Sequence, residues 1–287
     1  MASKIKTTIF YSFSLLVFFI TSISSYGQSD STLHQWRPDK PWTVSKYTVR
    51  AGGFWAVNTT KLGAGIEGKD YTLFSFENDL KMNRNTFSGM LNLDARFGKH
   101  HRIDFSYFNI YRKTSVTLDR DIDFGKHVYP IDSEIDAHLN TNIFRLSYGY
   151  SFFSNKQWEL GALFGFHVMT FNIGFDWNGE NIEQSYNDNV KFTAPLPDLG
   201  FFGTYAINNR WAVSGELSWL YVKYQSFKGR ILNASVSGQY RLNNHWEVAL
   251  GYSGYDVLVN LDRKHLDANF EWGYSGPFFN VAYKFGK

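Results

Sequence analysis

The sequence predicts an all-β protein: a transmembrane, antiparallel, up-and-down β-barrel of about ten strands (range 8–12) that follows a cleaved signal peptide. Three observations predict this class. Apolar residues alternate with small or polar residues over many segments, with the period of two that is typical of strands. Short turns alternate along the chain with longer connections. After residue 27, no apolar run approaches the ~18 residues that indicate a transmembrane helix.

The first 27 residues have the organisation of an export signal. Lys4 and Lys6 precede an apolar core at residues 9–20, and Ser25 and Gly27 place small residues before a cleavage point. The alternative is an uncleaved anchor helix, but this core is shorter than the ~20 residues that a span needs. We therefore predict a signal peptide at 1–27, a periplasmic N-terminal segment at 28–46 that lies in the periplasm or enters the lower lumen, and a barrel at 47–287.

Residues 144–152 give the clearest strand pattern, with phenylalanine, leucine and tyrosine on one face and arginine, serine and glycine on the other. Similar alternation occurs at 87–97, 158–168, 211–221, 232–242, 246–252 and 279–285. The longer connections are expected at 59–85, 114–137, 172–194 and 260–265. The apolar phase shifts near Pro277, which predicts a bulge, or twelve strands if Pro277 forms a turn. Residues 70–77 are a candidate for a short extra strand.

Composition restricts the class further. Aromatic residues make up 19% of the chain, too many for a disordered protein, and the absence of cysteine excludes disulfides and thiol chemistry. Without Lys4 and Lys6 the net charge falls from +3 to +1, and no basic patch suggests nucleic-acid binding. A soluble β-barrel is the alternative fold. We favour the membrane barrel because the polar faces are too small and hydrophilic for a dry core, and because three tryptophans that follow short turns would form an aromatic girdle: Trp158, Trp211 and Trp246.

Several runs resemble a largely uncharacterised family of Gram-negative outer-membrane barrels, described as porin-family and loosely OmpW-like. The resemblance covers residues 47–285 and rests on the runs at 100–108, 118–122, 145–152, 194–197 and 238–242. The terminal aromatics Tyr283 and Phe285 separately resemble the last strand of outer-membrane barrels, which also weighs against a soluble barrel. The sequence departs from the usual barrel ending because Gly286 and Lys287 follow the last aromatic residue. The resemblance implies the fold and the cell outer membrane as location, with no catalytic residues carried over.

The alternation predicts a lumen charge layer on inward faces close to the short turns: Arg96, Asp104, Arg145, Glu159, Glu216, Arg241 and Glu247, with Arg50 as a further candidate. Both signs are mixed at one depth, so in a narrow barrel these side chains should pair and close the lumen. The alternative is an ion or proton path through the layer. We expect that the protein is not an open diffusion pore.

The sequence favours no enzyme, metal site or cofactor. His167 faces the lumen and would need a carboxylate and a nucleophile in reach. Asp136 with His138, and Asp262 with His265, have no specific catalytic spacing, and no serine–histidine pair was found on an outward face. An acidic run at 119–125 resembles only the start of a calcium loop. A structural, adhesive or narrow-channel role, the last for small or apolar solutes, is favoured over the alternative of a lipid A-modifying hydrolase or an omptin-like protease.

The expected partners follow from the predicted location. They are outer-membrane lipid and lipopolysaccharide, which divalent cations would bridge to the acidic loops, and the barrel-assembly machinery. We expect a monomer. A lateral gap in the wall beside an apolar pocket would favour uptake of an apolar solute.

Overall fold

The computed structural model describes residues 45–65, 73–124, 127–177, 186–224, 227–263 and 266–286. The predicted signal peptide at 1–27 and most of the predicted N-terminal segment, up to residue 44, lie outside the described residues. Within the described part, no helix is both long enough and apolar enough to cross a membrane.

Ten antiparallel strands form a closed barrel, which confirms the predicted fold class and strand number. Each strand pairs with the next one along the chain, and the last closes on the first. The strands are β1 (Tyr47–Gly65), β3 (Asn85–Phe97), β4 (His101–Thr117), β7 (Glu134–Ser154), β8 (Trp158–Trp177), β9 (Tyr186–Ala206), β10 (Trp211–Tyr224), β11 (Phe227–Arg241), β12 (Trp246–Arg263) and β13 (Leu266–Phe285).

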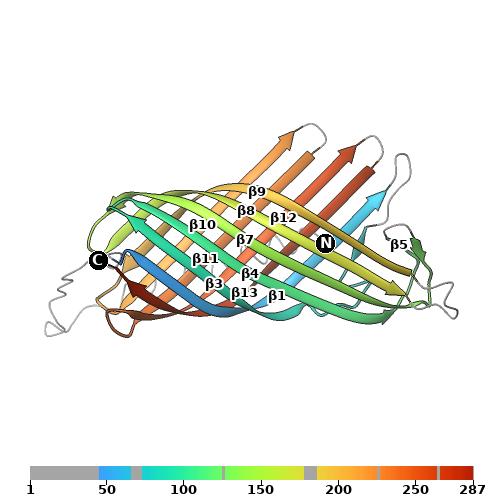
Figure 1. Cartoon of the computed structure of the whole chain (residues 1–287), viewed down its shortest axis with the longest axis horizontal. Helices are drawn as coiled ribbons and strands as arrows, with labels where there is room; N and C mark the ends of the chain where they lie inside the picture. The colour runs from blue at the N-terminus through green and yellow to red at the C-terminus, as the bar shows by residue number, and fades with distance from the viewer. Residues whose placement is uncertain are drawn as a thin grey trace, which may run out of the picture. The chain divides into compact units, whose positions relative to one another are not determined.

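Three short strands lie in the longer connections. β2 (Phe74–Ser75) pairs with β1, so the extra strand expected at 70–77 exists but has only two residues. β5 (Ile122–Phe124) and β6 (His127–Tyr129) form a hairpin between β4 and β7. In Figure 1 the strands run obliquely along the barrel, and β5 lies at the end opposite the C-terminus. The short turns gather at the C-terminal end, which we call the short-turn end.

The strands extend well beyond the predicted boundaries. Partway along them the apolar side chains change from the outward face to the inward face, so the alternation in the sequence is interrupted there. On β8 the outward side chains change from Phe164 and Phe166 to Thr170 and Asn172. The inward side chains change in the opposite sense, from glycine and His167 to Met169 and three further large apolar residues. The barrel is therefore apolar outside and polar inside near the short turns, and polar outside and apolar inside at the long-loop end. We call the apolar outer zone the apolar belt.

This exchange also explains the phase shift near Pro277, where the predicted bulge is wrong. β13 pairs with β12 in one continuous register from Tyr283 to Leu266, and Pro277 lies on the outward face within it. Phe279 belongs to the apolar belt, whereas Trp272 is buried in the lumen. The twelve-strand alternative is therefore wrong as well. The register shift in the wall lies elsewhere, between β7 and β8 at Ser151 and Phe153.

Two seams interrupt the wall toward the long-loop end. The β3–β4 ladder ends at Met90 opposite Phe108, and the β9–β10 ladder ends at Leu199 opposite Trp219. The second seam has a cause in the sequence. Pro195 and Pro197 have no backbone N–H. Because they are two residues apart on one strand, both missing donors belong to the same side of the strand. The β8 ladder continues through both prolines, so the missing donors lie on the β10 side. In Figure 1 the β10–β11 and β12–β13 hairpins diverge from β7–β9 at this end.

Candidate functional site

The lumen charge layer is built from ion pairs between strands. The guanidinium of Arg96 forms two hydrogen bonds to Glu159, with nitrogen–oxygen distances of 2.6 and 2.9 Å, and Ser151 donates a third to the same carboxylate. Nε of Arg102 lies 3.0 Å from a carboxylate oxygen of Asp104, so the two side chains form an ion pair. Because an arginine fork matches a carboxylate in geometry, these pairs fix the positions of both partners.

Arg145 is the hub of the layer. Its Nη2 lies 3.1 Å from Asp198, and its Nη1 donates to Glu216. Asp198 also lies 3.4 Å from Nδ1 of His167, whose Nε2 is 3.2 Å from the hydroxyl of Tyr255. His167 and Asp198 are both fully buried. His167 thus has a carboxylate in reach, but neither side chain of the pair is exposed.

The remaining charges lie close to the short turns. Lys284 donates to Glu247, and both side chains are buried. Arg241 is directly opposite Glu247 in the β11–β12 register. Arg50 pairs with Asp94 on the neighbouring strand. The structure thus brings the charges of the layer into contact with oppositely charged neighbours on nearby strands.

Sequence reasoning missed four members of this network: Asp94, Arg102, Asp198 and Lys284. Each lies on the inward face of its strand. Asp94 shares that face with the predicted residue Arg96, and Arg102 shares it with the predicted residue Asp104. Strict application of the two-residue period to every charged side chain would have included Asp94, Arg102 and Lys284. Asp198 was harder to find, because it directly follows the two prolines of β9.

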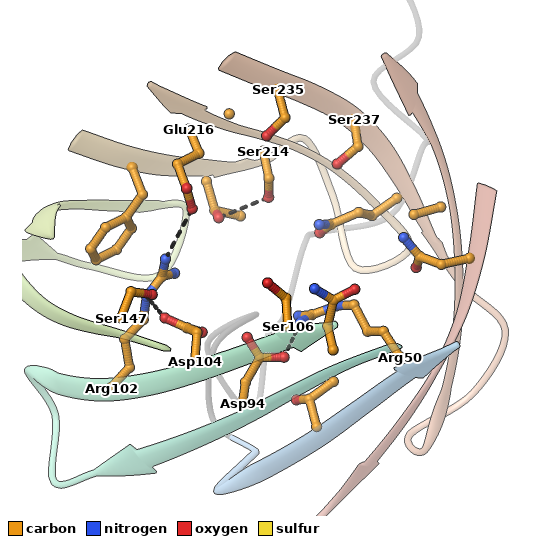
Figure 2. Close-up of a pocket in the computed structure, with 18 of the residues that line it drawn as sticks. Arg50, Asp94, Arg102, Asp104, Ser106, Ser147, Ser214, Glu216, Ser235 and Ser237 are labelled. Atoms are coloured by element: carbon orange, nitrogen blue, oxygen red, sulfur yellow. Dashed lines mark hydrogen bonds and ion pairs between the residues drawn. The ribbon is translucent and has the colours of Figure 1, made fainter. Parts of the chain in front are cut away.

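A polar cavity of about 240 Å³ lies within this half of the lumen. In Figure 2, Ser214, Ser235 and Ser237 of β10 and β11 face Arg50 and Asp94 across the open space, with Arg102, Asp104 and Glu216 at one side. A cavity lined by hydroxyls and paired charges is suited to hold water rather than an apolar ligand.

The other half of the lumen is filled by an apolar core. Inward aromatic side chains from four strands meet there: Phe54, Phe108, Phe171, Phe175, Phe270, Trp272 and Tyr274. Their ring contacts are close, for example 5.0 Å between the centroids of Phe54 and Tyr274 and 4.6 Å between those of Phe171 and Phe270. This half is packed as the interior of a soluble protein is packed. The polar inward faces near the short turns do not predict such a core.

Residues 73–83, which we call the inserted segment, complete the apolar core. Phe74, Phe76, Leu80 and Met82 of this segment are buried in the core. Phe74 and Phe76 stack on each other and lie 5.9 and 6.5 Å from Phe175. A segment of the connection between β1 and β3 therefore closes the lumen at the long-loop end.

A buried ion pair holds the inserted segment to the wall. Nη1 of Arg112 donates to Glu77 at 2.7 Å, and each side chain is only 2% exposed. The same carboxylate accepts from the backbone N–H of Thr60 at 2.9 Å, and Arg112 donates to the Thr60 hydroxyl. The pair therefore joins β1, β4 and the inserted segment at one point.

The β4–β7 connection packs over the inserted segment. Nη2 of Arg120 lies 2.9 Å from Asp79, and Lys81 pairs with Asp119. Tyr129 of β6 is buried and donates to Asp188 at 3.1 Å. Burial and the neighbouring carboxylate raise the pKa of Tyr129, so its hydroxyl remains protonated and available as a donor.

The three predicted girdle tryptophans are exposed on the outer wall directly after short turns. Each contacts a tyrosine directly opposite on the next strand. The ring centroids are 4.3 Å apart for Trp158 and Tyr205, 4.7 Å for Trp211 and Tyr240, and 5.0 Å for Trp246 and Tyr283. These pairs form the short-turn edge of the apolar belt.

Two hollows on the outer wall share Tyr111. One contains Ser115, Asp136 and His138 on the outward faces of β4 and β7, so a serine and a histidine do occur together on an outward face, which the sequence analysis had excluded. Ser115 donates its hydroxyl to Asp136. The second predicted pair, Asp262 with His265, falls on residues whose side chains lie outside the described part.

No family model and no curated protein sequence matches this chain. The fold is similar to that of the outer membrane protease OmpT from Escherichia coli, with a TM-score of 0.52 and 10% sequence identity over 89% of this chain and 100% of OmpT. The translocator domain of the autotransporter NalP from Neisseria meningitidis aligns with a TM-score of 0.44 and 14% identity over 83% of this chain and 87% of that domain. The P. putida toluene transporter TodX aligns with a TM-score of 0.34 and 9% identity over 84% of this chain and 91% of the TodX chain.

At these identities the similarity describes the fold alone, and it does not separate a protease from a transporter. The similarity of fold, the closed ladder of strands and the apolar belt nevertheless all indicate the same class of protein. The protein is a ten-stranded β-barrel of the Gram-negative outer membrane.

Proposed function

We propose that this protein is a closed, non-enzymatic barrel with a structural or adhesive role at the cell surface. The observation that carries the proposal is the inserted segment, whose Phe74, Phe76, Leu80 and Met82 fill the outer half of the lumen. A strand needs only about 9–11 residues to cross the bilayer, and β7 has 21. The outer half of the barrel therefore projects beyond the membrane as a rigid, packed platform for the surface loops.

Two barriers in series oppose diffusion through the lumen. An ion would meet the apolar core, whose aromatic and aliphatic side chains do not replace its hydration shell. An apolar solute would meet the lumen charge layer, where it would have to displace strong ion pairs such as Arg145 with Asp198. The sequence alternative of an ion path through the charge layer would still end at the apolar core.

The arrangement of the candidate catalytic groups supports a non-enzymatic role. The Ser115 hydroxyl is directed to Asp136, and the ring of His138 lies over the backbone of Gly174. A serine nucleophile needs its own proton directed to a base that then transfers it, and histidine commonly fills that role. Asp198 and His167 form a pair, but both are fully buried.

We expect the purified full-length mature protein to give no steady current in planar lipid bilayers. The physical reason is that buried apolar side chains of the wall and of the inserted segment fill the outer half of the lumen in the described part of the chain. The measurement is single-channel recording at several voltages, with a known open porin as positive control. A large, steady conductance would overturn the proposal of a closed barrel.

A second candidate function, passage of small apolar solutes, is favoured by the seam between β9 and β10. Leu196 and Leu220 face inward on the two sides of this seam and pack against the apolar core. An apolar molecule dissolved in the outer leaflet would meet an apolar interior there without crossing the surface loops.

A disulfide across the seam tests this second candidate. Pro197 and Tyr221 are the first outward-facing opposed positions beyond the last bonded pair, Leu199 and Trp219, and the chain has no native cysteine. If solutes enter there, the oxidised Pro197→Cys, Tyr221→Cys protein should bind a fluorescent apolar probe more weakly than the reduced form does. Equal binding in both redox states would remove the seam as an entry point.

The narrower family and the partners are also proposals. Membership of the OmpW-like barrels rests on the sequence runs alone, and lipopolysaccharide and the barrel-assembly machinery follow from the outer-membrane location. A monomer is consistent with closure of β13 on β1, which leaves no long barrel edge for a second copy.

A further inference from the structure

The first hollow of the outer wall lies in the apolar belt. It has a volume of about 500 Å³ and forms where β3 separates from β4, beyond the pair of Met90 and Phe108. Aromatic rings of Phe87, Tyr107 and Tyr111 line it, together with three small residues that leave the space open: Ala51, Gly52 and Gly89. We call it the acyl hollow.

The second hollow follows directly along β4 and is polar. It has a volume of about 480 Å³ and also begins at Tyr111. The cross-strand register places its groups in two rows. Lys113 is opposite His138 in the nearer row, and Ser115 is opposite Asp136, itself opposite Asp176, in the farther row. We call it the headgroup hollow.

The boundary between the two hollows coincides with the outer edge of the membrane. β4 begins at His101, and about 9–11 residues of a tilted strand cross the hydrocarbon. This count ends near Tyr111, a residue type that is enriched at the interface. The acyl hollow therefore faces the tails of the outer leaflet, and the headgroup hollow faces its polar layer.

We propose that these two hollows form one binding site for a phospholipid with a phosphoethanolamine headgroup. An acyl chain lies in the acyl hollow, the phosphate contacts Lys113, and the ammonium contacts the carboxylates of Asp136 and Asp176. In such a lipid the phosphate lies nearer the tails than the ammonium, and Lys113 lies nearer the membrane than the two carboxylates.

The spacing of the two rows also fits. Two residues along a strand advance roughly 7 Å, and a tilt near 45° reduces this to about 5 Å along the membrane normal. That separation is comparable to the distance between phosphorus and nitrogen across the two carbons of ethanolamine. Among the described residues that line the hollow, a headgroup with phosphate but no ammonium would meet two carboxylates and one lysine, which is unfavourable.

The acyl hollow is tested by filling it. A Cβ atom built on Gly89 has no neighbour nearer than 3.9 Å, so Gly89→Leu should fold and occupy the hollow. The matched control is Gly238→Leu, at an outward position of β11, where the nearest atom lies 4.0 Å away. The full-length mature protein in detergent is titrated with dioleoyl phosphatidylethanolamine, and bound lipid is counted by native mass spectrometry. We expect Gly89→Leu to bind about tenfold more weakly, as expected for loss of two buried methylene groups, and Gly238→Leu to bind as the wild type does.

The headgroup hollow is tested by changing its charge. Asp136→Asn with Asp176→Asn should remove the preference for phosphatidylethanolamine over phosphatidylglycerol, whereas Lys113→Gln should weaken binding of both lipids. Lys223→Gln, at an exposed position of β10 elsewhere on the wall, serves as the charge control.

Each further outcome decides the assignment. Equal binding of the two phospholipids by the wild type would overturn the headgroup assignment. Tighter binding of lipid A in the presence of calcium would assign the site to lipopolysaccharide instead. Release of fatty acid from the bound lipid, lost in Ser115→Ala, would replace a binding role with a hydrolytic one. Unchanged binding in Gly89→Leu would remove the site altogether.

Discussion

Glu77→Gln is expected to open the lumen. The change leaves the guanidinium of Arg112 without its carboxylate at a position that is 2% exposed. Breaking a buried ion pair by removal of one partner costs about 3–5 kcal/mol. Because the pair joins the inserted segment to β1 and β4, we expect that cost to favour states in which the segment leaves the apolar core. Bilayer recordings of this variant should then show current steps that the wild type lacks.

Two further variants separate opening from misfolding. Lys81→Gln removes an exposed pair of the same segment, Lys81 with Asp119, and should leave the lumen closed because exposed pairs contribute little. Glu77→Leu combined with Arg112→Met replaces the pair by apolar side chains of similar size and should restore closure. Circular dichroism checks that each variant keeps its β-structure. A folded Glu77→Gln protein that never conducts would mean that aromatic packing alone retains the segment.

The part of each strand inside the membrane could be predicted from sequence, and the part outside could not. In the belt, lipid on one side and a polar lumen on the other impose opposite demands on alternate residues, so Phe164 and Phe166 reveal the strand directly. At the long-loop end the demands are reversed. Phe171 and Trp272 face inward there, whereas the large apolar residues of the belt face outward. In the sequence this reversal has the same pattern as a strand end or a bulge. The phase shift near Pro277 therefore predicts a bulge that the structure does not contain there.

The inserted segment shows a different limit. The alternation of Phe74 and Phe76 is typical of a strand, and only two residues form one. What fixes the segment is contact with Thr60, Arg112 and Phe175, which are far away in sequence. No local pattern encodes those contacts, so the apolar core that closes the lumen could not be anticipated.

The lumen charges show a third limit. The two-residue alternation predicts that Arg145 and Glu216 face the lumen, but it does not predict which charged side chains form ion pairs. Arg145 of β7 contacts Asp198 on β9 and Glu216 on β10, which lie two and three strands away around the wall. Such contacts depend on the barrel diameter and on the stagger between strands, which local sequence does not specify.

Arg145→Met is expected to produce the largest loss of stability in the inner half of the barrel. It leaves both Asp198, which is fully buried, and Glu216 without their shared cation. Since Asp198 then carries a buried charge without an arginine, and Glu216 keeps only the more distant Arg102 at 3.8 Å, we expect a loss of about 3–5 kcal/mol in the free energy of unfolding. The measurement is the urea midpoint of refolded protein in detergent, followed by tryptophan fluorescence and by the heat-dependent shift in gel mobility.

The matched control is Arg230→Met, because Arg230 forms a pair with Asp256 on the outer surface, where the two side chains are 39% and 45% exposed. That change should stay within about 1 kcal/mol of the wild type. Equal effects of the two arginine variants would contradict a special role for the hub.

The triple variant Arg145→Met, Asp198→Asn, Glu216→Gln separates a structural layer from an ion path. It keeps the side-chain volumes and removes the charges, so it should recover most of the lost stability if the layer serves to hold the strands together. A lumen that depends on these charges for closure would instead conduct in the triple variant despite normal folding. Because the apolar core lies in series with the layer, we expect the triple variant to stay closed and to conduct only when Glu77→Gln is added to it. A triple variant that conducts by itself would show that the apolar core is not the second barrier.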